Sequence, residues 1–219
     1  MGQDQELPPI HWRVNEWFPD LGPETLAKLK LYQEKLIDVN KTVNLVSPKT
    51  IYFADVIHFG DSILASRLLT PSIKAGSKVY DFGSGNGFPG LIFALLNPKI
   101  EVVLVEMDAK KCEFLNQMVP LLKLSNALVL NKTVESLPEN SINVAICRGF
   151  NTIAKTLLIT RKIVSKGGVI FHLKSEEWGI EVGEIPIQLC SSWSPGLLGD
   201  YKLPVGTLKF SIVRTDKIA

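Results

Sequence analysis

The sequence predicts an α/β fold with a mostly parallel, seven-stranded sheet that follows a set of N-terminal helices. Two observations support this prediction. Up to about residue 70, apolar residues recur every three or four positions, which is the period of an amphipathic helix. From Lys78 onward, short apolar runs rich in β-branched residues alternate with helical patterns, which is typical of a parallel sheet covered by helices.

Two helices are predicted before the sheet begins. The first spans residues 24–41, because Pro23 and Glu24 open a stretch with helical periodicity. The second spans residues 50–69, between the Ser47-Pro48 break and Pro71. We expect residues 1–75 to form a helical extension that packs on a core of residues 76–219, the two parts together making one structural domain.

Five strands and three covering helices are predicted in the first part of the core. The strands are expected at Lys78–Phe82, Val102–Glu106, Ala127–Asn131, Ile142–Cys147 and Gly168–Lys174. The helices are expected at Pro89–Leu96, Asp108–Leu122 and Thr152–Val164. Two further runs, Ile187–Trp193 and Thr207–Arg214, flank the Pro/Gly-rich segment 194–206 and are predicted to close the sheet as an antiparallel pair.

Composition excludes several classes of protein. The chain has 219 residues, of which 46% are hydrophobic and 21% charged, as in a folded soluble domain. No apolar stretch approaches the roughly 20 residues that span a bilayer. The segment Met1–Ile10 lacks the basic flank and apolar run of a secretory signal, so we expect a cytoplasmic protein.

The cysteines and histidines suggest neither a disulfide framework nor a metal site. Cys112, Cys147 and Cys190 are odd in number and widely spaced, and we expect all three to be reduced, with Cys147 buried at the end of an apolar run. The three histidines, His11, His58 and His172, have no Cys or His at a spacing usable for a metal. We interpret them as structural residues or as residues that face a bound substrate.

The first predicted strand leads into a glycine-rich loop, Asp81-Phe-Gly-Ser-Gly-Asn-Gly-Phe-Pro-Gly90. Glycines between a strand and a helix let the backbone turn tightly and approach a ligand that the helix N–H groups can also contact. The spacing of Gly85, Gly87 and Gly90 also matches a dinucleotide fingerprint. Asp81 would repel a pyrophosphate, however, and suits the cationic amino-acid end of S-adenosylmethionine.

A second acidic residue lies at the end of the next strand. Glu106 follows the first glycine of the loop by the length of one β-α-β unit, and a carboxylate there can accept hydrogen bonds from both ribose hydroxyls of an adenosine. This residue supports an adenosine ligand, either NAD or S-adenosylmethionine. After the third strand, the loop around Val134 and Glu135 is where an adenine edge would contact the backbone.

Four segments together resemble one enzyme family, the ribosomal RNA small subunit methyltransferase G family, also called glucose-inhibited division protein B. They are the glycine loop continued to Leu91, Val43-Asn-Leu-Val-Ser47, His58-Phe-Gly-Asp-Ser62 and Ile146-Cys-Arg-Gly-Phe150. The resemblance implies a class I S-adenosylmethionine-dependent methyltransferase fold, which is Rossmann-like. It also implies methylation of a guanine N7 in 16S rRNA near the decoding region, on naked RNA or on the small ribosomal subunit.

The resemblance and the motif analysis together define the expected site. The cofactor-binding residues are expected to be Asp81, Gly83, Gly85, Gly87, Phe88, Glu106, Val134, Glu135 and Arg148. Asn44, Arg148 and Lys174 are expected to bind RNA. The chain departs from the family pattern at Gly149-Phe150, next to the arginine, and at Lys174-Ser175, where the family has Lys-Gly.

The expected reaction needs no catalytic side chain. Guanine N7 carries an in-plane lone pair and no proton, so in-line positioning of about 3 Å is sufficient and no general base is expected. A cation that donated directly to N7 would block the nucleophile, so Arg148 is expected to hold the cofactor or a flanking phosphate.

A basic segment is the candidate RNA surface. Between Glu139 and Glu176 there are six basic and no acidic residues, although the net charge of the chain is only +2. The basic residues are Arg148, Lys155, Arg161, Lys162, Lys166 and Lys174. We expect a monomer with no membrane partner.

Three other functions remain open at this stage. A methyltransferase that acts on a small molecule or a protein would keep the glycine loop without needing the basic segment. An NAD-dependent oxidoreductase is disfavoured by Asp81. A non-catalytic adenosine-binding module on the ribosome would have the same loop.

Overall fold

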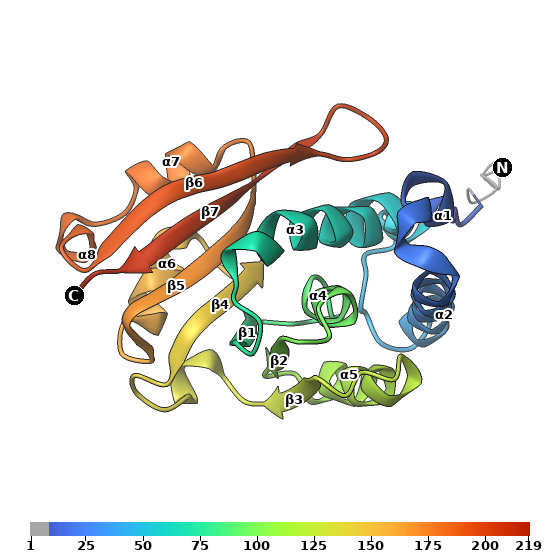
Figure 1. Cartoon of the computed structure of the whole chain (residues 1–219), viewed down its shortest axis with the longest axis horizontal. Coiled ribbons are helices and arrows are strands. Elements are labelled where there is room, and N and C mark those ends of the chain that lie inside the picture. The colour runs from blue at the N-terminus through green and yellow to red at the C-terminus, as the bar shows by residue number, and fades with distance from the viewer. Residues whose placement is uncertain (1–8) are drawn as a thin grey trace, which may run out of the picture.

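The computed structural model describes residues 9–219, and Figure 1 shows a central twisted sheet with helices on both faces. The segment 1–8, in which we expect no secretory signal, lies outside the described residues. The helices are α1 (Val14–Trp17), α2 (Gly22–Asn40), α3 (Asp61–Leu69), α4 (Gly90–Leu96), α5 (Ala109–Leu121), α6 (Ile153–Thr160), α7 (Trp178–Gly183) and α8 (Ile187–Cys190). The strands are β1 (Lys78–Phe82), β2 (Glu101–Glu106), β3 (Ala127–Asn131), β4 (Ile142–Arg148), β5 (Val164–Ser175), β6 (Trp193–Lys202) and β7 (Lys209–Lys217).

The sheet has the strand order β3-β2-β1-β4-β5-β7-β6. The first five strands are parallel, and β7 is antiparallel to both β5 and β6. This topology confirms the predicted α/β fold with a mostly parallel, seven-stranded sheet and an antiparallel pair at its end. Because β1 is paired with β2 on one side and β4 on the other, the loops after these three strands meet at one edge.

Successive residues of each strand point to opposite faces and build two cores. Helices α2, α3, α4 and α5 contribute to a core on one face that includes Val79 and Leu104. Helices α6, α7 and α8 contribute to a core on the other face that includes Phe82 and Val105. Both faces of the parallel strands are therefore buried, which explains why these strands read as continuous apolar runs.

The second predicted N-terminal helix, residues 50–69, is present but is not uniform. It starts as a short 3₁₀ turn, Ile51–Phe53, continues as a π-helical turn, Asp55–Gly60, and becomes regular only in α3. A π-helical turn is rare and is often found at functional sites. Among residues 9–219, no helix is long and apolar enough to cross a membrane.

The strand predicted at Ile187–Trp193 is wrong. Residues 187–190 form the one-turn helix α8 after Pro186, and the strand begins only at Trp193. It then continues through the first part of the Pro/Gly-rich segment 194–206 as far as Lys202. Pro195 is tolerated because β6 is the last strand of the sheet, so its outward N–H groups need no partner in the ladder.

Two other predicted boundaries shift where a helix gives way to a strand. Helix α6 ends at Thr160 rather than at Val164, because Val164 already pairs with Ile142 at the start of β5. The predicted strand Gly168–Lys174 is the central part of β5, which is longer at its N-terminal end.

Candidate functional site: a cavity at the carboxyl edge of the sheet

A cavity of about 360 Å³ opens where β2, β3 and β4 end. It is bounded by the glycine loop, the end of β2, the loop after β3, and the loop and first turns that follow β4. Its lining residues are Gly83, Val105, Glu106, Met107, Lys132, Thr133, Val134, Glu135, Gly149, Phe150, Asn151, Lys155 and Ile159. Four of the predicted cofactor-binding residues, namely Gly83, Glu106, Val134 and Glu135, are therefore brought together in one cavity.

The glycine loop packs too closely for side chains at several positions. Gly83 has φ +67°, and a Cβ atom there would lie 2.7 Å from the ring of Phe150. Gly87 has φ +93°, and its Cβ would lie 2.6 Å from the Tyr32 hydroxyl. Left-handed backbone and close approach both require glycine at these positions. The loop thus follows the path that the sequence predicts for a ligand-binding turn.

Glu106 joins the glycine loop to the end of β2. Its Oε2 atom accepts a hydrogen bond of 2.8 Å from the N–H of Gly85, and its Oε1 atom accepts one of 2.9 Å from the N–H of Asp108. Glu106 is 7% exposed and lines the cavity. Each carboxylate oxygen has a second lone pair, so both ribose hydroxyls of an adenosine could still donate to it.

Asp81 lies beneath the glycine loop rather than in the cavity. It shares the face of β1 with Val79, packs against Gly90, and is 1% exposed. Burial raises the pKa of its carboxyl to about 7. Its Oδ2 atom has no hydrogen-bond partner among residues 9–219. Because Oδ2 packs against Gly90 and not into the cavity, Asp81 can favour a cationic ligand group only through its charge, without a direct hydrogen bond.

Phe88 and Arg148 also lie outside the cavity. The Phe88 ring stacks on Tyr32 at 4.9 Å and on His58 at 5.3 Å, and it is 3% exposed. The Arg148 guanidinium lies 5.7 Å from the same ring and turns toward the π-helical turn and α3, where it pairs with Asp61 at 2.7 Å. The glycine loop and Arg148 are therefore connected through an aromatic side chain.

Sequence reasoning missed the residues that hold Arg148. The Arg148 guanidinium donates to the Ile57 carbonyl oxygen and to His58 Nδ1 as well as to Asp61. Burial, reinforced by the charge of Arg148, lowers the pKa of His58 to about 3, so this imidazole is neutral and can accept a hydrogen bond. The available signal was the segment His58–Ser62, in which His58 and Asp61 lie three residues apart, and it was noted only as part of the family resemblance.

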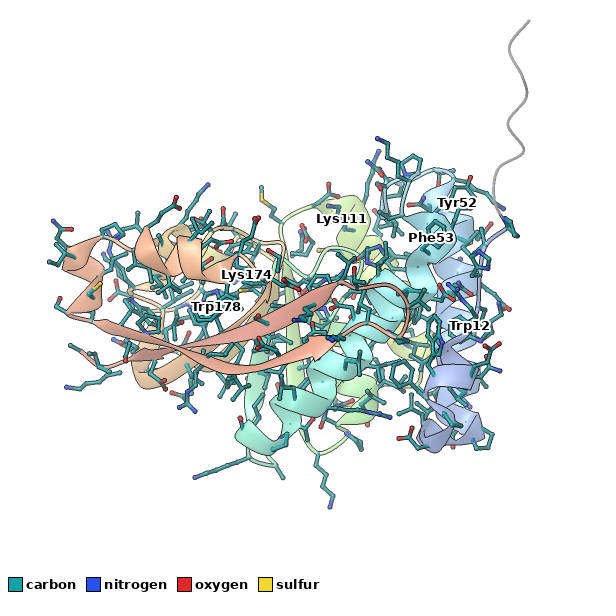
Figure 2. All side chains as sticks on the ribbon, turned by 90° about the horizontal axis from the view of Figure 1, so that it is seen from above. Trp12, Tyr52, Phe53, Lys111, Lys174 and Trp178 are labelled. Atoms are coloured by element: carbon teal, nitrogen blue, oxygen red, sulfur yellow. The ribbon has the colours of Figure 1, made fainter. Side chains whose placement is uncertain are left out.

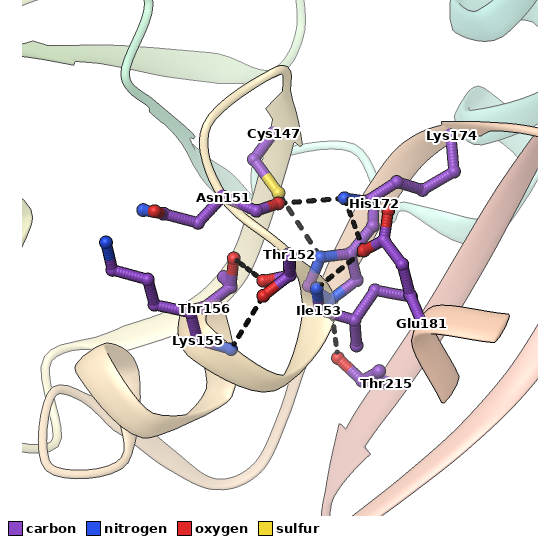
Figure 3. Close-up of polar contacts among 10 residues, drawn as sticks. All are labelled: Cys147, Asn151, Thr152, Ile153, Lys155, Thr156, His172, Lys174, Glu181 and Thr215. Atoms are coloured by element: carbon purple, nitrogen blue, oxygen red, sulfur yellow. Dashed lines mark hydrogen bonds and ion pairs between the residues drawn. The ribbon is translucent and has the colours of Figure 1, made fainter. Parts of the chain in front are cut away.

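Lys174 forms an ion pair and a hydrogen bond inside the fold and is not a free surface cation (Figure 3). Its ammonium donates to the Asn151 carbonyl oxygen at 2.8 Å and pairs with Glu181 of α7 at 2.7 Å. Glu181 also accepts the backbone N–H of Ile153, at the start of α6. The side chain of Lys174 is only 12% exposed. Lys174 thus supports the cavity wall formed by Gly149, Phe150 and Asn151.

The remaining predicted RNA contact, Asn44, is exposed but does not line the cavity. Its loop lies next to the glycine loop, since the side chain of Asn86 donates to the Leu45 carbonyl oxygen at 3.0 Å. In Figure 2, Lys174 and Trp178 lie in the half of the molecule that holds the hairpin, whereas Trp12, Tyr52 and Phe53 lie in the helical half.

The six basic residues of segment 148–174 do not form one surface, so that interpretation is wrong. Arg148 and Lys174 are engaged inside the fold, and Lys155 lines the cavity. Arg161, Lys162 and Lys166 belong to the turn before β5 and its first residues, at the opposite edge of the sheet. Charge proximity in the sequence was lost because α6 carries the chain from one edge of the sheet to the other.

The cysteines and the core histidine have structural environments. Cys112, Cys147 and Cys190 are free thiols, and the first two are buried. Cys147 Sγ lies 3.4 Å from His172 Nδ1, and the other nitrogen of His172 lies 3.0 Å from the Thr215 hydroxyl (Figure 3). Burial raises the pKa of Cys147 to about 12 and lowers that of His172 to about 3. Neither group is charged near neutral pH. Among residues 9–219, no cluster of His, Cys, Asp or Glu could hold a metal ion.

The strand order, the glycine loop after β1 and the acid at the end of β2 define a class I S-adenosylmethionine-dependent methyltransferase fold. Solved structures agree on the fold. A SAM-dependent methyltransferase from Aquifex aeolicus has a TM-score of 0.55 at 15% identity and covers 84% of this chain and 97% of its own. The YcgJ protein from Bacillus subtilis has a TM-score of 0.56 at 14% identity, covering 74% of this chain and 100% of its own.

Sequence comparison gives the family. The family model GidB, rRNA small subunit methyltransferase G, matches residues 25–192. Ribosomal RNA small subunit methyltransferase G 3 of Bdellovibrio bacteriovorus is 58% identical over 217 residues, covering 99% of this chain and 98% of that protein. Ribosomal RNA small subunit methyltransferase G of Syntrophomonas wolfei is 34% identical, covering 70% of this chain and 72% of that protein. The chain belongs to the rRNA small subunit methyltransferase G family.

Ionisation of Asp81 is expected to make stability depend on pH. Because the folded-state pKa is raised, the contribution of Asp81 to stability is complete below pH 3.8 and is lost as the pH rises to about 7. Relative to Asp81→Asn, the wild-type free energy of unfolding should fall by about 4 kcal/mol at most between pH 4 and pH 8. Urea denaturation at several pH values measures this difference, and a difference that does not change with pH would contradict it.

The ion pair between Lys174 and Glu181 is expected to couple these two residues energetically. In a double-mutant cycle of Lys174→Met and Glu181→Gln, the coupling measured by urea denaturation should be about 1–2 kcal/mol, because Lys174 is only 12% exposed, Glu181 is partly buried, and both make further hydrogen bonds. The exposed pair Lys162–Glu139 is the matched control and should show no measurable coupling. Equal coupling in the two cycles would show that the Lys174–Glu181 ion pair stabilises the fold no more than an exposed pair does.

Proposed function

We propose that this chain transfers a methyl group from S-adenosylmethionine to N7 of a guanine in 16S rRNA near the decoding region. The single observation that carries the choice of substrate is membership of the rRNA small subunit methyltransferase G family, with a relative that matches nearly the full length of the chain. The cavity at the carboxyl edge of the sheet supports the cofactor, because its polar groups suit an adenosine.

The side chains and loops divide the cofactor between them in this proposal. Glu106 accepts the ribose hydroxyls, and the loop around Val134 and Glu135 contacts the adenine. The glycine loop, with Gly83, Gly85 and Gly87, approaches the part of the molecule between ribose and methionine. Asp81 lies buried beneath this loop, so it favours the ammonium group through its charge when it is ionised, and not through direct contact.

The chemistry depends on positioning. S-adenosylmethionine supplies an electrophilic methyl group on a sulfonium, and guanine N7 supplies an unprotonated lone pair, so the protein needs no residue to remove a proton. Transfer moves positive charge onto the purine, which oxygen acceptors near the base would stabilise.

The RNA side of the proposal rests on exposed residues around the cavity rather than on Lys174. Lys132 and Lys155 line the opening and are exposed, and Asn44 is exposed beside the glycine loop. These groups can meet phosphates without breaking internal ion pairs. We also propose that the chain works as a cytoplasmic monomer in which residues 1–75 and the core of residues 76–219 act as one unit.

Methyl transfer to ribosomal particles tests the function directly. Labelled S-adenosylmethionine is incubated with the protein and small ribosomal subunits that lack the modification, in parallel with naked 16S rRNA and small-molecule and protein acceptors. We expect label in the RNA and a single strand break near the decoding region after cleavage at 7-methylguanine. Label only in another acceptor, or a methylated site elsewhere in the RNA, would overturn the proposal.

Glu106 is expected to dominate cofactor affinity. Glu106→Gln replaces one of the two acceptor oxygens with a donor, so binding of S-adenosylmethionine measured by calorimetry should weaken by about 10- to 100-fold, or about 1.4–2.8 kcal/mol. Glu101→Gln is the control, because Glu101 begins the same strand and pairs with Lys78 at the far edge of the sheet. Equal affinity of the Glu106 variant and wild type would refute the assigned role.

A further inference from the structure

The hairpin formed by β6 and β7 reaches across the sheet edge to α3. Figure 1 shows it extending over this helix. One hydrogen bond holds it there, and at two glycines the backbone runs so close to a side chain that an added Cβ atom would touch it. The Tyr201 hydroxyl donates to Asp61 Oδ1 at 2.6 Å, and a Cβ atom on Gly60 would lie 3.5 Å from Pro204. A Cβ atom on Gly199 would lie 3.1 Å from the side chain of Leu68. The family match ends at residue 192, so it says nothing about this hairpin.

Asp61 connects the hairpin to Arg148. Its Oδ1 atom accepts from Tyr201, and its Oδ2 atom accepts from Arg148 Nη1 at 2.7 Å. The Asp61 side chain is 3% exposed, so water contributes little to holding its charge. A buried carboxylate is stable only when both oxygens are well hydrogen-bonded, and here one bond comes from each side.

Tyr201 is suited to remain a donor in this arrangement. Burial, followed by the negative charge of Asp61, raises its pKa far above the ordinary value of 10.0, so the phenol keeps its proton. A neutral donor on one oxygen leaves the other oxygen of Asp61 directed at the guanidinium. The orientation of Asp61, and with it that of Arg148, therefore depends on a residue of the C-terminal hairpin.

Among residues 9–219, these contacts leave Arg148 with N–H groups that have no acceptor. A guanidinium has five N–H groups, and three are used by Ile57, Asp61 and His58. The two that remain can bind a further oxyanion, either the carboxylate of the methionine portion of the cofactor or an RNA phosphate. The side chain is 20% exposed, which leaves it within reach of a ligand.

We propose that Tyr201 is a positioning residue that holds Arg148, through Asp61, in the orientation needed for methyl transfer. The inference rests on the proposed function for its catalytic consequence, and on the contacts alone for its structural part. It makes the C-terminal hairpin a component of the site, although no hairpin residue lines the cavity.

A kinetic double-mutant cycle tests the proposal. Tyr201→Phe, which removes only the hydroxyl, should lower kcat/KM for methyl transfer about tenfold in the wild-type background. In a background with Arg148→Lys, the same change should lower kcat/KM by less than about twofold, because the planar guanidinium that Tyr201 orients is already absent. Lysine keeps a cation opposite the buried Asp61, so this background is expected to fold. Equal losses in the two backgrounds, or no loss in the first, would overturn the proposal.

Ser211→Ala is the matched control. The Ser211 hydroxyl donates to Asp200 at 2.7 Å, within the same pair of strands, and this bond does not reach α3. The Ser211→Ala variant should therefore have the same kcat/KM as wild type. A loss equal to that of Tyr201→Phe would show that the hairpin acts only through its general stability.

A nuclear magnetic resonance measurement separates this inference from the proposed function. The side-chain nitrogen signals of Arg148 are assigned by their absence from the spectrum of Arg148→Lys. In wild type and in Ser211→Ala, the two Nη atoms should give separate signals, because hydrogen bonds to Asp61 and His58 hinder rotation of the guanidinium. In Tyr201→Phe these signals should average. If the signals average in Tyr201→Phe but the wild-type protein methylates no RNA, the proposed function is wrong and the positioning role of Tyr201 is correct. Unchanged signals in Tyr201→Phe would overturn the positioning whatever the substrate is.

Discussion

Parallel pairing of β1 with β2 and β4 is the constraint on which the rest of the site depends. Asp81 lies in register with Leu104 of β2 and with Ile146 of β4, so the loops that follow these strands leave the sheet at one edge. The hydrogen bond from Gly85 to Glu106 then joins two of these loops directly. A cavity at this edge follows from backbone geometry, and glycines keep it open where side chains would collide.

Around this edge, the fold uses buried charges to hold its loops. Lys174 and Glu181 fix the turn after β4 from one side, and Asp61 fixes Arg148 from the other. Such groups are costly to bury alone and gain their stability from complete hydrogen bonding. Because the partners come from α7, α3 and β6, distant parts of the chain determine the shape of one small region. The N-terminal helices and the C-terminal hairpin therefore meet at Arg148, at the end of β4.

Some features could be predicted because local chemistry determines them. The glycine loop, Glu106 and the loop containing Val134 and Glu135 were predicted from strand ends and residue type, and the structure places them around one cavity. The strand at Ile187–Trp193 was mispredicted, because a short apolar run does not distinguish a strand from a helical turn. Lys174 was taken for an RNA contact, because its position in the sequence does not reveal that Glu181 lies beside it.

The sequence by itself determined the α/β alternation, the ligand-binding turn and the family, since each of these depends on periodicity or on residues within a few positions of one another. Only the tertiary structure decided which charged side chains are exposed and which are paired inside the fold. Tyr201 and Asp61 are 140 positions apart in the chain yet share a hydrogen bond. Contacts of this kind depend on how helices and strands pack, and no local pattern in the sequence encodes the partner.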